Sequence, residues 1–332
     1  MKVRFVVAAV LLVAGSALQG QDLQAPKCPG GSPLSAAQIA QDACQQAYDV
    51  YQFLSPELGL SLTGGNATAG QGGVLGGVGH FSVGVRGNVF HGLLPDVQDP
   101  AFAQSTTGAV RRTLPTTQQW IGLPTADAAV GLFRGFPLAL TNILGLDALL
   151  SGSYVPSIDK SNLSVKPHTN WQFGYGARVG LLSESIVTPG VSFTWIERDL
   201  PTTDITATAG NTRLDVLNAK VKTNAWRLVA SKSLIVFGVA VGVGRDHYEQ
   251  SANVSGTISQ GILNGSATAP GTNQTLNRTN IFADLSWNLP FFKIVGEIGQ
   301  ANGGTVETYN SFAGGRADRS QVYGSLGLRL SK

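Results

Sequence analysis

Residues 171–181, WQFGYGARVGL, decide the fold class of this chain. Apolar side chains occupy every odd position, and glycines, Gln172 and Arg178 occupy the even ones. Because successive side chains of a strand point to opposite faces, this order gives one apolar face and one small or polar face. The stretch therefore predicts a β-strand with an apolar medium on one side only.

The same alternation recurs along most of the chain, for example in residues 81–89, 235–243 and 322–330. It predicts strands at 78–90, 126–135, 145–155, 168–182, 188–198, 213–230, 234–250, 277–289, 291–300 and 318–330. A soluble sandwich and a membrane barrel both alternate in this way, so the connections have to separate the two.

Short connections, such as 183–188, 231–233 and 288–290, alternate with long polar ones, such as 91–125, 199–212, 251–276 and 301–317. A membrane barrel sorts its connections by side when both chain ends lie on the short-turn side, and a sandwich has no reason to do so. The fold class predicted is all-β: an antiparallel up-and-down transmembrane β-barrel of about ten strands, roughly 8–12, with a short N-terminal α-helix.

The composition favours a chain that contacts lipid but has no membrane-spanning helix after its first residues. Hydrophobic residues make up 43% and charged residues 13% of the 332 residues. After the first residues, no stretch has the roughly 20 continuous apolar residues that a membrane helix needs, and a closed barrel is the other fold that satisfies its backbone in lipid. The chain carries 23 basic and 20 acidic residues, so there is no basic field for nucleic acid.

The N-terminus divides into three parts. Lys2 and Arg4, an apolar run to residue 14 and small residues after it predict a signal peptide over 1–20; an uncleaved anchor is the alternative. Residues 21–77 form a leader, in which Cys28 and Cys44 are a candidate disulfide rather than a metal site. Residues 78–332 form the barrel.

One amphipathic helix is predicted from Ser35, as N-cap, to Leu54, ending near Pro56. Before a small barrel, such a helix could plug the lumen, dock on the periplasmic side or cap the barrel mouth. The glycine-rich stretch from 64 to 79 would permit a close backbone passage or a hinge.

The signal peptide and residues 78–332 together resemble bacterial outer-membrane β-barrel proteins. The resemblance implies an outer-membrane location, an N-terminal segment in the periplasm or the lumen, and long extracellular loops. It also implies outer-membrane lipid and the barrel-assembly machinery as partners. The chain departs from many members of the class at its end, Leu328 to Lys332, which lacks a terminal aromatic residue.

If the apolar faces meet lipid, six charged side chains point into the lumen, where they line a pore or pair into a plug: Arg86, Arg178, Asp284, Lys293, Glu297 and Arg329. The leading hypothesis is a passive channel for a small-molecule solute, with no cofactor and no metal. The alternatives are a structural or adhesive barrel that uses loops 91–125 and 251–276, and a barrel hydrolase with His91, His168 and His247 at one rim. Gly-x-Ser-x-Gly and His-Glu-x-x-His motifs are absent, so the chain is not predicted to be an enzyme.

Overall fold

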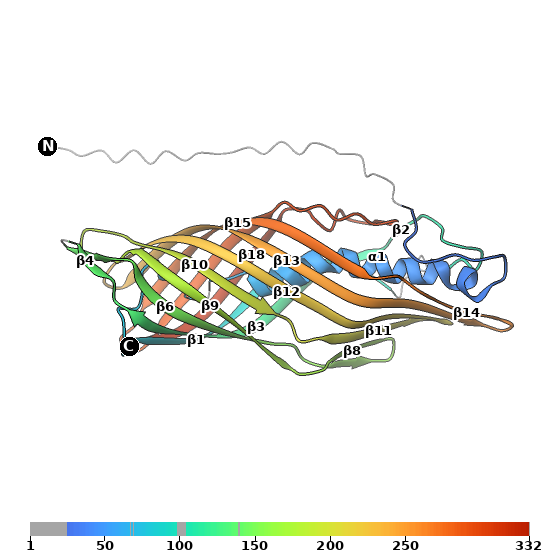
Figure 1. The fold of residues 1–332 in the computed structure, drawn as a ribbon, viewed down its shortest axis with the longest axis horizontal. Coiled ribbons are helices and arrows are strands. Elements are labelled where there is room, and N and C mark those ends of the chain that lie inside the picture. The colour runs from blue at the N-terminus through green and yellow to red at the C-terminus, as the bar shows by residue number, and fades with distance from the viewer. Residues whose placement is uncertain (1–24, 67, 69, 98–103, 139, 332) are drawn as a thin grey trace.

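Ten strands close into one antiparallel ring (Figure 1), which confirms the predicted fold class. The computed structural model describes residues 25–66, 68, 70–97, 104–138 and 140–331, so the predicted signal peptide lies outside the described residues. Pairing of the first and last ring strands closes the ring, with Ser82 opposite Ser331. In ring order the strands are β1 (Phe81–Pro95), β3 (Thr116–Phe133), β6 (Gly145–Tyr154), β9 (Trp171–Leu182), β10 (Gly190–Asp199), β12 (Thr212–Ser233), β13 (Phe237–Gln260), β15 (Thr272–Asn288), β16 (Lys293–Asn302) and β18 (Gln321–Ser331).

The shorter strands lie at the two ends of the ring. At one end, β7 (Ile158–Lys160), β8 (Leu163–Pro167), β11 (Thr203–Ala209) and β14 (Leu263–Thr268) continue the sheet outward from β12 and β13. The pair β2 (Thr113–Leu114) and β17 (Ser311–Phe312) lies between two long connections. At the other end, β4 (Phe136–Leu138) and β5 (Thr141–Ile143) form a hairpin.

The connections sort by side, as the sequence predicts. Residues 183–189, 234–236, 289–292 and the β4–β5 hairpin lie at what we call the short-turn end, together with the start of β1 and the end of β18. The opposite end, the long-loop end, carries 96–97, 104–115, 155–170, 200–211, 261–271 and 303–320.

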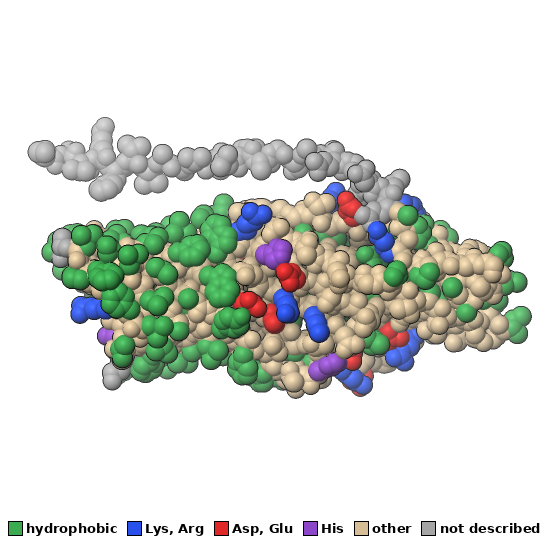
Figure 2. Space-filling view, viewed as in Figure 1, with side chains coloured by type: hydrophobic (Ala, Val, Ile, Leu, Met, Phe, Trp, Pro, Cys, Tyr) green, Lys and Arg blue, Asp and Glu red, His purple; other side chains and the backbone are tan. Residues whose placement is uncertain are grey.

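On the face seen in Figure 2, apolar side chains form a band over the half of the barrel next to the short-turn end. It consists of outward side chains such as Val85, Phe173 and Leu285, which are 60%, 64% and 61% exposed, and it extends onto the turn tips at Ile235 and Phe291. An outward apolar band flanked by polar surface is what a barrel embedded in lipid requires.

Within the described residues, no helix combines the length and the apolar character needed to span a membrane.

The interior holds α1 (Ala36–Thr63), the blue helix of Figure 1. Ser35 caps it, accepting a 3.2 Å hydrogen bond from the Gln38 N–H. The helix contacts β12, β13 and β14 most extensively. Its apolar side packs into a buried cluster at the long-loop end of the wall, which includes Ile39, Ala43, Ala47, Tyr51, Leu214, Val254, Ile258 and Ala267.

The helix continues past Pro56, so the expected end there is wrong. A proline inside a helix costs about 3 kcal/mol. Leu60 and Leu62 follow it and are fully buried, and each such side chain contributes about 1.5–3 kcal/mol. Burial of this last turn inside the barrel therefore offsets the proline.

Candidate functional site: a polar lumen closed by the N-terminal segment

The N-terminal segment passes through the barrel from one end to the other. The first turn of α1 lies against the β13–β14 hairpin at the long-loop end, where the Ala36 carbonyl approaches Gly265. After α1, the described residues 64–66, 68 and 70–77 form an irregular segment, which we call the thread, and Gly77 lies against Arg134 at the short-turn end. There the chain turns back into β1. The described N-terminal end and the end of β18 thus lie at opposite ends of the barrel, with α1 and the thread in the lumen between them.

Side chains of the wall bind the C-terminal end of α1. A helix leaves its last four carbonyls without partners inside the helix, and its C-terminus carries partial negative charge. Asn88 donates to the carbonyls of Leu60 and Ser61 at 2.9 and 3.1 Å. Arg198 donates to Leu62 O at 3.2 Å, Arg227 to Thr63 O at 3.1 Å and Arg86 to Gly64 O. Arginine therefore supplies both the missing donors and the charge that this helix end favours.

Carboxylates of the wall hold the thread through its N–H groups. Glu297 accepts from the Asn66 N–H at 2.9 Å, and Asp284 accepts from the Gly70 N–H at 3.0 Å. Asp147 accepts from the Leu75 N–H at 3.2 Å.

Neutral and basic wall residues complete this set. They are the Ser231 hydroxyl, which accepts from the Gly72 N–H at 2.6 Å, Arg329, which donates to Thr68 O at 3.3 Å, and Arg178, which donates to Gln71 O at 3.4 Å. Every one of these hydrogen bonds ends on a main-chain atom of the thread.

Ion pairs within the wall hold the arginines in place. Arg86 pairs with Asp127 at 2.6 Å, Arg178 with Asp147 at 2.6 Å, and Arg227 with Asp246. These side chains are at most 6% exposed, and a buried arginine needs such a carboxylate to balance its charge. Counting these supports, all ten ring strands contribute to the lining that holds α1 and the thread.

The six predicted lumen residues do not all do the same thing. Arg86, Arg178, Asp284, Glu297 and Arg329 face inward, are buried and bind the thread. Lys293 is half-buried at the start of β16, opposite Arg329 in the strand register.

The charged residues of this lining that were not predicted are Asp127, Asp147, Arg198, Arg227 and Asp246, and the polar Asn88 and Ser231 were not predicted either. The signal for the charged residues was available, because each lies in a predicted strand at a position of lumen parity. Cys28 and Cys44 are bonded in the structure, which ties residues 25–35 to the first turns of α1.

Two carboxylates on α1 receive the long loops that cover it. Asp42 accepts from the N–H groups of Ser105 and Val110 at 2.7 and 2.9 Å and pairs with Arg112 at 2.8 Å. Asp49, seven residues later on the same helix face, accepts from the N–H groups of Tyr309 and Asn310 at 3.0 and 2.9 Å. The polar face of α1, which amphipathicity alone would leave in solvent, is therefore buried under loops 104–115 and 303–320.

The carboxyl of Asp49 makes stability depend on pH. Burial raises its pKa from 3.8 to about 6. The folded state then binds the proton more tightly than the unfolded chain, so this contribution is present below pH 3.8 and is lost as the pH rises to about 6. A shift of about two units corresponds to ~3 kcal/mol.

We expect the unfolding midpoint in urea to fall between pH 4 and pH 7 more steeply in the wild type than in Asp49→Asn, which has no proton to lose. Asp42, whose pKa burial also raises, is present in both proteins and cancels in the comparison. Equal pH dependence in the two proteins would contradict the assignment to Asp49.

The three histidines of the hydrolase alternative lie on separate parts of the barrel. His91 is on β1 beside Trp120, His168 lies 3.2 Å from Asp204, and His247 is on β13 within 3.0 Å of Asn277. His247 points outward, because its neighbours Asp246 and Tyr248 point into the lumen. The structure does not bring these histidines together at one rim.

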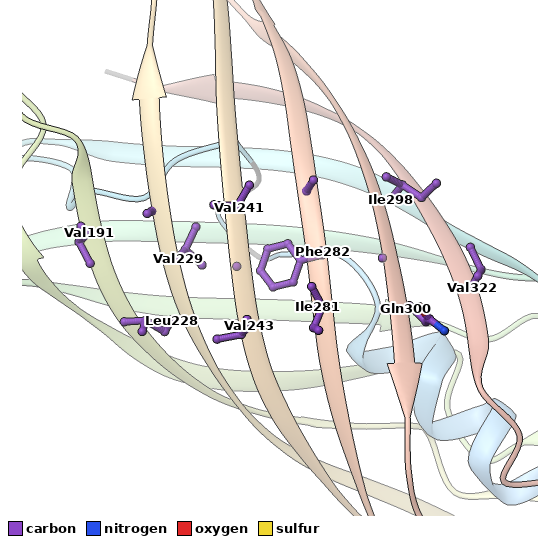
Figure 3. A pocket seen from close by; sticks show the side chains of 14 residues that line it. Val191, Leu228, Val229, Val241, Val243, Ile281, Phe282, Ile298, Gln300 and Val322 are labelled. Atoms are coloured by element: carbon purple, nitrogen blue, oxygen red, sulfur yellow. The ribbon is translucent and has the colours of Figure 1, made fainter. Parts of the chain in front are cut away.

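An apolar pocket on β12, β13, β15, β16 and β18 faces away from the lumen (Figure 3). Val241, Ile281 and Ile298 line it and belong to the outward face, being 60%, 58% and 64% exposed. It is a depression in the outward apolar band.

The closed ring, the outward apolar band and the polar lumen define the class: the chain is an antiparallel β-barrel of the membrane-embedded type. No family model matches it, and no curated protein matches it. Solved structures with some likeness include the translocator domain of the autotransporter NalP from Neisseria meningitidis, which is 9% identical with a TM-score of 0.36 over 76% of this chain and 87% of that one. The toluene transporter TbuX from Ralstonia pickettii is 11% identical with a TM-score of 0.30, over 91% and 98% of the two chains. The anion-selective porin from Comamonas acidovorans is 10% identical with a TM-score of 0.18, over 76% and 98%. At TM-scores below 0.5 these likenesses carry no argument, and the class rests on the geometry of the chain itself.

Proposed function

We propose that this protein is a channel for small polar molecules, kept closed by its own N-terminal segment. The observation that carries the proposal is the lumen lining, in which charged side chains from all ten strands surround a segment whose covalent link to the wall is the main chain leading into β1. The disulfide joins Cys28 to Cys44 within the N-terminal segment itself. Among the described residues, the side chains of the wall hold this segment through non-covalent contacts.

The size of the barrel supports a conductive path once the segment is absent. Side chains alone just fill a barrel of about eight strands. Here ten strands enclose a helix, and a helix with its side chains is about 10–12 Å across. Without α1 and the thread, the arginines and carboxylates of the wall would border a hydrated path, which suits small polar solutes rather than apolar ones.

Deletion of residues 21–76 tests the proposal in planar lipid bilayers. We expect the wild type to insert without conducting and the truncated barrel to show stable single-channel steps. Heat-modifiable migration in detergent gels checks that the truncated ring is closed. A full-length variant, Asp284→Asn with Glu297→Gln, serves as a second test, because it weakens the grip on the thread without removing it and should give brief openings.

A folded, inserted truncated barrel that carries no current would contradict the channel and favour the structural or adhesive alternative. That alternative would rely on loops 91–125 and 251–276, the second of which contains β14. Lipid and the assembly machinery stay predicted partners, and the proposal includes no catalytic step.

A further inference from the structure

The direction of the N-terminal segment has a consequence for membrane topology. Both β1 and β18 have their free ends at the short-turn end, and α1 begins at the long-loop end. The path from Ala36 to Gly77 is therefore an eleventh crossing of the barrel, made through its centre. In barrels of this class, short turns face the periplasm and long loops face the exterior.

We propose that the lumen is a route for extended polypeptide, and that the N-terminal part of this chain has passed outward through it, so that residues 25–35 lie at the cell surface. This goes beyond a closed channel for small solutes and does not depend on it, since a segment can be delivered by a pore that conducts nothing afterwards.

The lining fits an extended polypeptide because of which atoms it binds. In the thread, wall side chains bond three carbonyls and four N–H groups of the main chain, and they also bond the last two carbonyls of α1. Every polypeptide carries these groups, whatever its side chains. Arginines supply donors to the carbonyls, and carboxylates and a serine supply acceptors to the N–H groups, so both halves of each peptide unit can be satisfied without secondary structure.

The composition of the thread agrees with a narrow passage. Residues 64–73, GGNATAGQGG, contain five glycines. A Cβ at Gly72 would lie 2.6 Å from the Ser231 backbone N and 2.7 Å from the Gly190 carbonyl O, so the backbone passes where no side chain fits. The small residues of the thread thus lie beside Ser231 and Gly190, where the backbones approach closely. The bulkier side chains of α1 lie next to the long loops.

Three single-cysteine positions with matched exposure test the topology. Ser32→Cys places a thiol in the exposed stretch ahead of α1, Ile262→Cys lies at the tip of the β13–β14 hairpin, and Ile235→Cys lies at a short-turn tip. Ile262 and Ile235 are 98% and 99% exposed in the wild type. The native cysteines stay bonded to each other and do not react.

A membrane-impermeant maleimide is applied to intact cells and to permeabilised cells. We expect Ser32→Cys to be labelled in intact cells to the same extent as Ile262→Cys, with no gain on permeabilisation, whereas Ile235→Cys is labelled only after permeabilisation. Labelling of Ser32→Cys that requires permeabilisation, as for Ile235→Cys, would overturn the proposal.

A second readout addresses the passage itself. An epitope-tagged, glycine- and serine-rich extension placed ahead of residue 25 should be accessible to antibody on intact cells. An extension that is produced and stays on the periplasmic side would overturn the proposal, and this result is separate from any bilayer current, which tests the channel.

Discussion

Asp147→Ala should lower the free energy of unfolding by about 3–5 kcal/mol, because removing one partner of a buried pair leaves a buried charge without compensation. Asp147 and Arg178 are both fully buried, and the guanidinium donates to the carboxylate from Nε at 2.9 Å and from Nη2 at 2.6 Å. The same carboxylate accepts from the Leu75 N–H, so the variant also loses a hydrogen bond to the thread. Urea unfolding in lipid vesicles, followed by tryptophan fluorescence, measures the loss.

Two further variants test whether the loss in Asp147→Ala comes from an uncompensated buried charge. Arg178→Met combined with Asp147→Leu removes both charges and should recover most of the stability, since apolar replacement of a buried pair is often neutral. Arg213 pairs with Asp215 at 2.8 Å but is 59% exposed, so Arg213→Ala should cost at most about 1 kcal/mol. Equal losses in Asp147→Ala and Arg213→Ala would refute the claim that burial sets the size of the effect.

Gly256→Val should displace α1 from the wall and cost about 1–3 kcal/mol, the usual range for overpacking a core. Gly256 lies on the inward face of β13, and a Cβ there would collide with the backbone of Ala43 and Cys44. Because the obstacle is backbone rather than the end of a flexible side chain, the helix itself has to move. The unfolding temperature of the purified barrel reports the cost, and intermittent current in bilayers reports the displaced helix.

Gly296→Val is the matched control for this substitution. Gly296 lies on β16, and a Cβ there would meet no heavy atom within 4 Å. Valine is favoured in strands, so this variant should be at least as stable as the wild type and remain closed. If both valine variants behaved alike, contact between α1 and β13 would not be the cause.

The ten strands were predictable because lipid imposes an outward apolar side chain at every second position. Between the apolar band and the long-loop end, the apolar side chains point inward instead. On β13, Val241 and Val243 point outward in the band, whereas Val254 and Ile258 point inward against α1, with polar residues outside. Residues 251–276, predicted as a loop, are in fact the end of β13, all of β14 and the start of β15. Had the reversal been recognised, it would have indicated an apolar helix inside the barrel.

The lumen was predictable only in part, for a different reason. Strand parity identifies which side chains face inward, and it gave Arg86, Arg178 and Glu297 correct orientations. Their partners depend on strand tilt and register around the ring. The bonds from the wall to residues 62–75, such as that from Arg227 to Thr63 O, join segments far apart in the chain, and no local pattern encodes them.

The pairing of β1 with β18 interlocks the barrel with the segment that lies inside it. The ten strands form a ring that is closed by the pairing of β1 with β18, with Ser82 opposite Ser331. Helix α1 lies inside this ring and is joined to it through the main chain. While the ring is closed, α1 cannot leave it sideways. It can only slide along the barrel axis or be enclosed when the β1–β18 seam forms. Motion of α1 relative to the closed ring is thereby restricted to the barrel axis, and assembly either places α1 before the β1–β18 seam closes or threads the segment through the closed ring.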